Sequence, residues 1–301
     1  MRQEILAPAG WGERIGKHIE ALEGVRHPLA APEALEQAAD FAARELAVLG
    51  YQVKEQLFPA HDRMFRNIVA TLPGTGRPEE RVLVVAHYDT VANSPGADDN
   101  ASGTAGLLEM ARRLAGLSFE RTLQFIAVCL EENQTTGDHG TGLLGSKALA
   151  ELAAREGWQI EGVLVLESIG FAGPDLVQQA PPGLPAKVPE VGDFIAVVAN
   201  ERSRELSGVY LAAAQAPGIE LPCLHLVVPG NGEMFRDTRR SDHAPFWDHG
   251  YPALMLTDTT NFRSPHYHEP SDTLATLNLD FAARVCRAAT AAVLDLARLK
   301  P

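Results

Sequence analysis

Short apolar segments of strand length alternate with segments of helical periodicity along most of the chain. The segments 82–87, 123–131 and 163–167 are almost entirely apolar until their last residues, and this pattern is typical of strands buried on both faces of a sheet. Helices must then cover both faces. The sequence therefore predicts an α/β fold: one α/β/α sandwich around a mixed, largely parallel central sheet.

Two helices within residues 1–50 are expected before the first strand, and one long helix closes the chain. The strands 51–58 and 67–72 are joined by a short link, so they should pair antiparallel and make the sheet mixed. No second core, repeat or low-complexity segment is visible, which predicts a single domain over residues 1–301. The expected elements are helices at 13–22, 32–49, 102–115, 143–155 and 279–299, strands at 51–58, 67–72, 82–87, 123–131, 163–167, 194–199, 224–228 and 253–256, and a proline-rich surface loop at 171–191.

The net charge of −13 argues against a basic face that binds nucleic acid or an anionic membrane, and it suits an enzyme that holds cations. The apolar runs are far shorter than the roughly 18 residues of a membrane span. Cys129, Cys223 and Cys286 cannot all be paired, and the N-terminus lacks the apolar centre of a signal peptide. These observations predict a cytoplasmic protein, but a secreted protein that has lost its leader would look the same.

Metal-binding residue types stand at the ends of several expected strands, where open α/β sheets build their sites. His87 ends one strand, and Asp89 lies on the same side of an extended chain, where its carboxylate can accept the second ring N–H. In PGADDNASG, Asp98 and Asp99 precede the start of a helix, and two consecutive aspartates are more than a helix cap needs. Taken alone, each motif is also compatible with an ordinary polar turn or cap.

Two further segments carry carboxylates and histidines. The strand 123–131 leads into Glu131 and Glu132, and adjacent carboxylates at a buried strand end repel one another unless one binds a cation. The segment TNFRSPHYHEPSDT holds two histidines, the second of which is His268, and Glu167 ends the strand VLVLE. A solvated acidic turn and an aromatic, proline-rich loop are the alternative interpretations.

In this order, the motifs resemble one family closely, the M28 zinc peptidases, whose members include bacterial aminopeptidases. The resemblance runs from about residue 87 to residue 273 and is carried by HYD, GADDNASG, LEEN, LESIG, RRSDHAPF and PHYHEPSDT. It implies an α/β/α sandwich, two zinc ions per chain and hydrolysis of peptide substrates, with removal of N-terminal residues as the expected activity. The related M20 peptidases normally insert a lid domain before the last histidine, and none is visible here.

Carried over residue by residue, the resemblance implies two zinc sites that share one bridging ligand. The implied ligands are His87 and Glu167 for one ion, Glu132 and His268 for the other, and Asp99 between them. Glu131 is the implied general base for attack by a metal-bound hydroxide. The acid of LESIG is usually aspartate in well-known members, so Glu167 is where this chain departs from the pattern.

Other residues of the motifs receive supporting roles. Tyr267 matches a tyrosine that steadies the tetrahedral intermediate, and Arg240 matches an arginine that contacts the substrate carbonyl. Asp89 and Asp242 are expected to support the ligands rather than bind metal, and a helix cap explains Asp242 equally well. His139 is expected on the surface.

Other activities fit the same scaffold. The resemblance extends to glutaminyl cyclases, which are acyltransferases with one zinc ion, and to peptidases that release a C-terminal acidic residue. Some relatives are binding modules that have lost their metals, an interpretation that needs gaps in the ligand set, and none is visible. The sequence leaves open the side-chain preference, the oligomeric state and the native metal, since cobalt and manganese also accept nitrogen and oxygen ligands.

Overall fold

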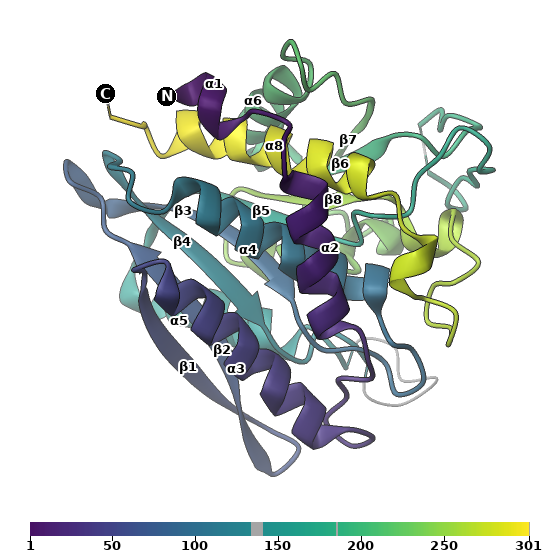
Figure 1. Ribbon diagram of the computed structural model, residues 1–301, viewed down its shortest axis with the longest axis horizontal. Helices are drawn as coiled ribbons and strands as arrows, with labels where there is room; N and C mark the ends of the chain where they lie inside the picture. The colour runs from purple at the N-terminus through teal and green to yellow at the C-terminus, as the bar shows by residue number, and fades with distance from the viewer. Residues whose placement is uncertain (134–140, 185, 301) are drawn as a thin grey trace.

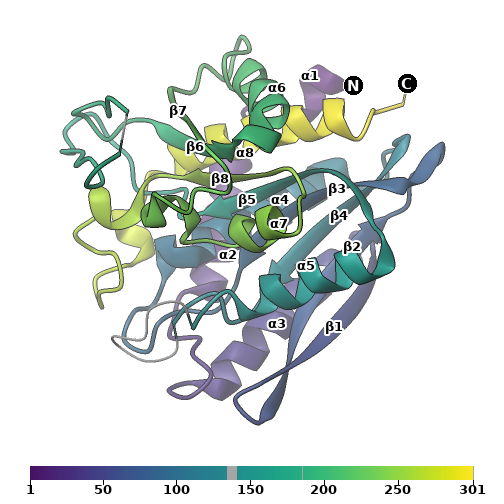
Figure 2. The same ribbon diagram turned by 180° about the vertical axis from the view of Figure 1, so that it is seen from behind.

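The computed structural model describes residues 1–133, 141–184 and 186–300, so His139 lies outside the described residues. These residues form one eight-stranded sheet with helices on both faces (Figures 1 and 2). Its strands are β1 (Gln52–Ala60), β2 (Arg63–Leu72), β3 (Arg77–His87), β4 (Arg121–Val128), β5 (Gln159–Glu167), β6 (Ile195–Asn200), β7 (Cys223–Val228) and β8 (Ala253–Thr257). Its α-helices are α1 (Arg2–Ile5), α2 (Trp11–Leu22), α3 (Pro32–Val48), α4 (Gly103–Leu114), α5 (Leu144–Glu156), α6 (Arg204–Ala214), α7 (His243–Asp248) and α8 (Leu279–Leu296).

The strand order is β1-β2-β4-β3-β5-β8-β6-β7, and the pairing is mixed. β4, β3, β5 and β8 are parallel neighbours, and β6 pairs parallel with β7. β1 with β2, β2 with β4, and β6 with β8 are antiparallel. This confirms the predicted fold class and the predicted antiparallel pair at its start.

The two faces of the sheet carry separate apolar cores, because successive residues of a strand point to opposite faces. In β3, Val82 and Val84 belong to the core that also holds the apolar faces of α2, α3, α4, α6 and α8. Leu83 and Val85 belong to the core beneath α5 and α7. Figure 1 shows α2, α3 and α4 in front of the sheet, and Figure 2 shows α5 and α7 in front of it.

Most predicted elements are present, but two features differ from the prediction. The strand that was expected to reach Glu131 leaves the ladder at Val128, because Leu130 has a φ of 58° and the Cys129 N–H donates to the Asn67 side chain at 3.0 Å. The sequence also gives no prediction of α1 or α6, and for α7 it offers only the alternative of a helix cap at Asp242. The change of direction after Val128 brings the two glutamates to the edge of the sheet.

The predicted loop at 171–191 has only one isolated bridge, between Val177 and Val191, among its described residues. Arg263 holds this loop through hydrogen bonds. Its guanidinium donates to Gln178 Oε1 at 2.8 Å and to the Phe171 carbonyl at 3.2 Å. None of the described helices has both the length and the apolar character to cross a membrane.

Candidate metal centre and active site

The predicted ligands meet at the carboxyl ends of three neighbouring strands. His87 ends β3, Glu167 ends β5, and Glu131 and Glu132 follow β4. These strands are parallel to one another, so their carboxyl ends lie at the same edge of the sheet. Asp99 comes from the turn between β3 and α4, and His268 comes from the loop before α8. All are buried except His268, which is partly exposed.

The carboxylate of Asp99 lies between the two histidines. Its Oδ1 is 3.3 Å from His87 Nε2, and its Oδ2 is 3.1 Å from His268 Nε2. His87 Nε2 is also 3.3 Å from Glu167 Oε2, whereas His268 Nε2 is 3.0 Å from Glu132 Oε1. The side chains thus form two clusters that share Asp99.

These clusters fit metal ions. The candidate metal ligands also divide into two groups of three in a second way, by the distances between their donor atoms. Within each group these atoms lie within 4.8 Å of one another. One group is His87, Glu131 and Glu167, and the other is Asp99, Glu132 and His268. The buried His87 Nε2 has no partner with hydrogen-bond geometry among the described residues. A nitrogen and oxygen donor set of this kind suits zinc.

The electrostatics of the site also favour cations. Burial raises the pKa of Glu131 well above its usual range, and the charges of Glu167 and Glu132 raise it further. Burial and the charge of Asp99 raise the pKa of Glu132 to about 7. Burial alone lowers the pKa of His268, but Glu132 and Asp99 outweigh it and raise that pKa to about 10. The raised pKa values show that negative charge is crowded in this site, where divalent cations would take the place of the protons on His268 and the glutamates.

Asp89 supports the site differently from the prediction. The partner of the His87 ring is the Asp89 backbone carbonyl, 3.2 Å from Nδ1, while the nearer carboxylate oxygen is 3.6 Å away. The carboxylate instead accepts the backbone N–H groups of Glu131 and Glu132, each at 3.1 Å. Asp89 therefore links the end of β3 to the segment that carries both glutamates.

Asp272 orients the aspartate pair before α4. Its carboxylate accepts the backbone N–H of Asp98 at 2.8 Å and that of Asp99 at 3.2 Å. The Asp98 side chain accepts the Gly170 N–H at 2.8 Å, so Asp99 is the member of the pair that faces the histidines. Ser102 does not cap α4 with its side chain, and its hydroxyl donates to the Asp98 carbonyl at 2.7 Å.

The RRSDH segment supports Glu167 through a residue that the sequence analysis did not select. The Ser241 hydroxyl donates to Glu167 Oε2 at 2.7 Å. Asp242 is fully buried, makes no side-chain cap hydrogen bond at the start of α7, and has no hydrogen-bond partner for either oxygen among the described residues. Burial raises its pKa to about 7. In the sequence, Ser241 is distinguished only by its position next to Asp242.

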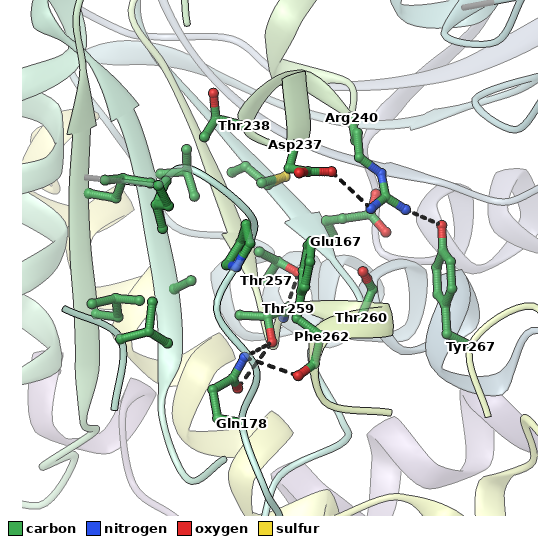
Figure 3. A pocket seen from close by; sticks show the side chains of 18 of the residues that line it. Glu167, Gln178, Asp237, Thr238, Arg240, Thr257, Thr259, Thr260, Phe262 and Tyr267 are labelled. Atoms are coloured by element: carbon green, nitrogen blue, oxygen red, sulfur yellow. Dashed lines mark hydrogen bonds and ion pairs between the residues drawn. The ribbon is translucent and has the colours of Figure 1, made fainter. Parts of the chain in front are cut away.

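Tyr267 and Arg240 lie together and line the same pocket as Glu167 (Figure 3). Arg240 Nη2 donates to the Tyr267 hydroxyl at 2.9 Å, and Nη1 donates to Asn261 Oδ1 at 2.8 Å. The Tyr267 ring stacks on the His268 ring, with centroids 3.8 Å apart. Burial, with the nearby charge of Asp99, raises the pKa of Tyr267 well above its usual range, so its hydroxyl keeps its proton.

The other two histidines of these motifs lie apart from the clusters. His266 Nδ1 is 2.9 Å from Ser271 Oγ. His243 is fully buried, with Nε2 2.8 Å from the Thr238 carbonyl and its ring 4.4 Å from that of Trp247. Both residues belong to the structure around the site rather than to the ligand set.

Two proteins of similar sequence show what this chain is related to. The chain is 31% identical over 286 residues to "Uncharacterized protein YfbL" of Escherichia coli strain K12, a match that covers 91% of this chain and 84% of that protein. It is 28% identical to a "Probable zinc metalloprotease" of Leptosphaeria maculans over 67% of this chain, and it spans about half of that relative's length (48%).

Two solved structures share the fold. The aminopeptidase from Aneurinibacillus sp. strain AM-1 matches with a TM-score of 0.74 and 17% identity, covering 100% of this chain and 97% of that one. Porphyromonas gingivalis glutaminyl cyclase matches with a TM-score of 0.72 and 20% identity, covering 94% and 98%. The sequence pattern of Peptidase family M28 matches residues 67–293, which include every predicted ligand. The chain belongs to peptidase family M28.

Proposed function

We propose that this M28 peptidase is a two-zinc aminopeptidase that removes N-terminal residues from peptides. The observation that carries the proposal is the position of Asp99, which presents one carboxylate oxygen to His87 and the other to His268, at 3.3 and 3.1 Å. His87 and Glu167 would hold one zinc ion. Glu132 and His268 would hold the other, and Asp99 would contact both.

The residues around the clusters have separate tasks in hydrolysis. When bound, a zinc pair supplies Lewis acidity and lowers the pKa of a water molecule. Glu131, whose Oε2 is 3.9 Å from His87 Nε2, takes a proton from the attacking water and gives it to the leaving amine. The Tyr267 hydroxyl, held by Arg240, donates a hydrogen bond to the carbonyl oxygen as negative charge develops there.

The charge of the site supports an aminopeptidase more than a carboxypeptidase. Glu131 and Glu167 line the pocket beside the reaction centre, and their negative charge favours a free α-ammonium group. Arg240, the cation that lines this pocket among the described residues, already donates to Tyr267 and Asn261.

A substrate panel tests the proposal. Aminoacyl-p-nitroanilides, the same peptides with blocked N-termini, and an N-terminal glutamine peptide are incubated with zinc-loaded enzyme and with chelator-treated enzyme. The proposal predicts zinc-dependent hydrolysis that a free N-terminus requires. Cleavage of blocked peptides from the C-terminus would contradict it, and so would release of ammonia from the glutamine peptide without hydrolysis, the reaction of a glutaminyl cyclase.

A further inference from the structure

One buried arginine lies on the short link between α2 and α3, before residue 67, where the match to the family pattern begins. The Arg26 side chain is almost completely enclosed, with the residue 2% exposed. Its guanidinium donates to five backbone carbonyls, those of Leu22, Gly24, Tyr88, Pro95 and Gly96. Arg26 therefore joins parts of the chain that are far apart in the sequence.

Two of these carbonyls stand at the ends of the segment that separates two proposed zinc ligands. Arg26 Nε donates to the carbonyl of Tyr88, the residue after His87, at 2.7 Å. Arg26 Nη2 donates at 3.0 Å to the carbonyl of Gly96, which precedes the aspartate pair that contains Asp99. Because a guanidinium is planar and its N–H groups point in fixed directions, the two bonds fix the separation of the segment's ends.

The Gly96 end of this segment belongs to the turn that carries Asp99. The Gly96 carbonyl also accepts the backbone N–H of Ala101 at 3.0 Å. Gly96 has a φ of 58°, and a side chain at this position would collide with the Asp99 carbonyl oxygen and with Thr90. The turn is thus closely packed, so that a shift of Gly96 would also move Asp99.

The link that carries Arg26 is itself tied to the chain around the metal clusters. The Arg26 backbone N–H donates to Thr90 Oγ1 at 2.8 Å, and the Thr90 N–H donates to the Arg26 carbonyl at 3.0 Å. Glu23 Oε2 accepts the backbone N–H of Leu274 at 3.0 Å, and Leu274 follows His268 in the stretch before α8. The link therefore contacts both stretches of chain that lead to the shared ligand and its neighbours.

The charge and the hydrogen bonds of Arg26 have opposite effects on a bound cation. Burial lowers the pKa of Arg26 to about 10, and the charges of Asp89, Asp272 and Asp99 oppose this effect, so the guanidinium is protonated at neutral pH. Its positive charge alone would repel a zinc ion held by Asp99. Its hydrogen bonds would favour zinc, because they hold the carboxylate in place.

We propose that Arg26 is a positioning residue for the zinc site, which fixes the segment from Tyr88 to Gly96 and thereby holds Asp99 between His87 and His268. The inference rests on the proposed two-zinc function. Arg26 acts through Asp99, the ligand that both ions would share. Its substitution should therefore weaken the binding of both zinc ions.

Zinc titration of metal-free protein, in competition with a coloured chelator, tests this role. Arg26→Lys keeps the charge and loses the planar fork, and Arg26→Met loses both. Each should weaken zinc binding at least about tenfold, because substitution of groups that orient metal ligands typically costs about 10–100-fold in metal affinity. The matched control is Arg287→Lys on α8, where a buried arginine donates to the Leu6 carbonyl at 2.8 Å. It should lower the thermal stability and leave the zinc affinity unchanged.

The outcomes separate positioning from the alternatives. Unchanged zinc affinity in folded Arg26→Lys would overturn the proposal and leave Arg26 a purely structural role. Tighter zinc binding by Arg26→Met would also overturn it, since that is the effect of the charge alone. A wild-type chain that binds fewer than two zinc ions would contradict the proposed function instead.

A milder variant keeps the test informative if both Arg26 variants misfold. Thr90→Val preserves the shape of the side chain and removes the acceptor of the Arg26 backbone N–H. It should weaken zinc binding by about 2–10-fold, the effect of one hydrogen bond. Unchanged zinc affinity in this variant would overturn the proposal.

Discussion

The adjacent carboxylates of Glu131 and Glu132 face different halves of the site. Their backbone N–H groups both donate to Asp89, and this contact holds the segment in place. Glu132 Oε1 is 3.0 Å from His268 Nε2, whereas Glu131 Oε2 is 3.9 Å from His87 Nε2. Glu132 therefore lies beside the proposed ligand His268, and Glu131 lies further from His87, a separation that suits the proposed base.

This difference predicts opposite effects of two conservative substitutions. Glu131→Gln should lower kcat at least about 10²-fold, because general acid–base catalysis contributes about 10²–10⁴-fold, with zinc content unchanged. Glu132→Gln should lower zinc occupancy first and activity as a consequence. Each variant is the control for the other, with kcat and zinc content measured on the same samples. Loss of metal in Glu131→Gln alone would mean that the two roles are exchanged.

Glu167 belongs to the His87 half of the site, and its Oε2 accepts the Ser241 hydroxyl at 2.7 Å. Glu167→Ala should therefore remove the metal bound near His87 and leave about one zinc ion per chain in the other half. Glu161→Ala, on the same strand but partly exposed, is the matched control and should keep the full content. Equal weakening of both metals in a zinc titration would show that the ligands are wrongly paired.

The position of the proposed ligands at the edge of the sheet was predictable from the sequence, and the contacts that support them were not. His87 and Glu167 end apolar strands, so their position at the sheet edge follows from the strand pattern alone. The contact between Ser241 and Glu167 joins residues far apart in the chain, and no local pattern encodes it. The Asp89 contacts depend on the turn at Leu130, whose positive φ is not a preference of leucine.

At the scale of elements, the sequence predicted the long periodic helices and missed α1 and α6, and for α7 it offered only a cap at Asp242. α6 carries Gly208 in its interior, which weakens the local helical signal. α7 is only six residues long, too short for a helical period to be visible. Its existence depends on packing, since Phe246 and Trp247 are buried against the sheet.

α7 should make the stability of the protein sensitive to acid through its first residue. Burial lowers the pKa of His243 to about 4, from the model-peptide value of about 6.5. The unfolded chain therefore binds more protons between these values, and stability is full above pH 6.5 and falls as the pH drops towards 4. From pH 7 to pH 5, His243 should remove about 2 kcal/mol from the free energy of unfolding.

Urea unfolding at both pH values tests this, with His243→Gln as the comparison, because glutamine can still donate a hydrogen bond to the Thr238 carbonyl. The variant should lose about 2 kcal/mol less than the wild type between pH 7 and pH 5. Parallel losses in the two proteins would show that His243 is not the titrating group.

At the scale of the whole molecule, the sheet positions both the proposed metal ligands and the pocket beside them. The carboxyl ends of β3, β4 and β5 bring the proposed ligands together, and residues of β5, β8, β6 and β7 line the pocket beside them. The position of the ligands was predictable, because it needs only the order of strands and residue types. The lining of the pocket was not, because shifting a strand by one residue would turn its side chains to the other face.

The number of zinc ions per active chain tests the central claim most directly. Purified protein is saturated with zinc, freed of excess metal and measured by mass spectrometry together with its aminopeptidase activity, before and after chelation. The account predicts two zinc ions per fully active chain, loss of activity on chelation and its return on adding zinc. A fully active, saturated protein with one zinc ion, or activity that survives complete removal of metal, would contradict it.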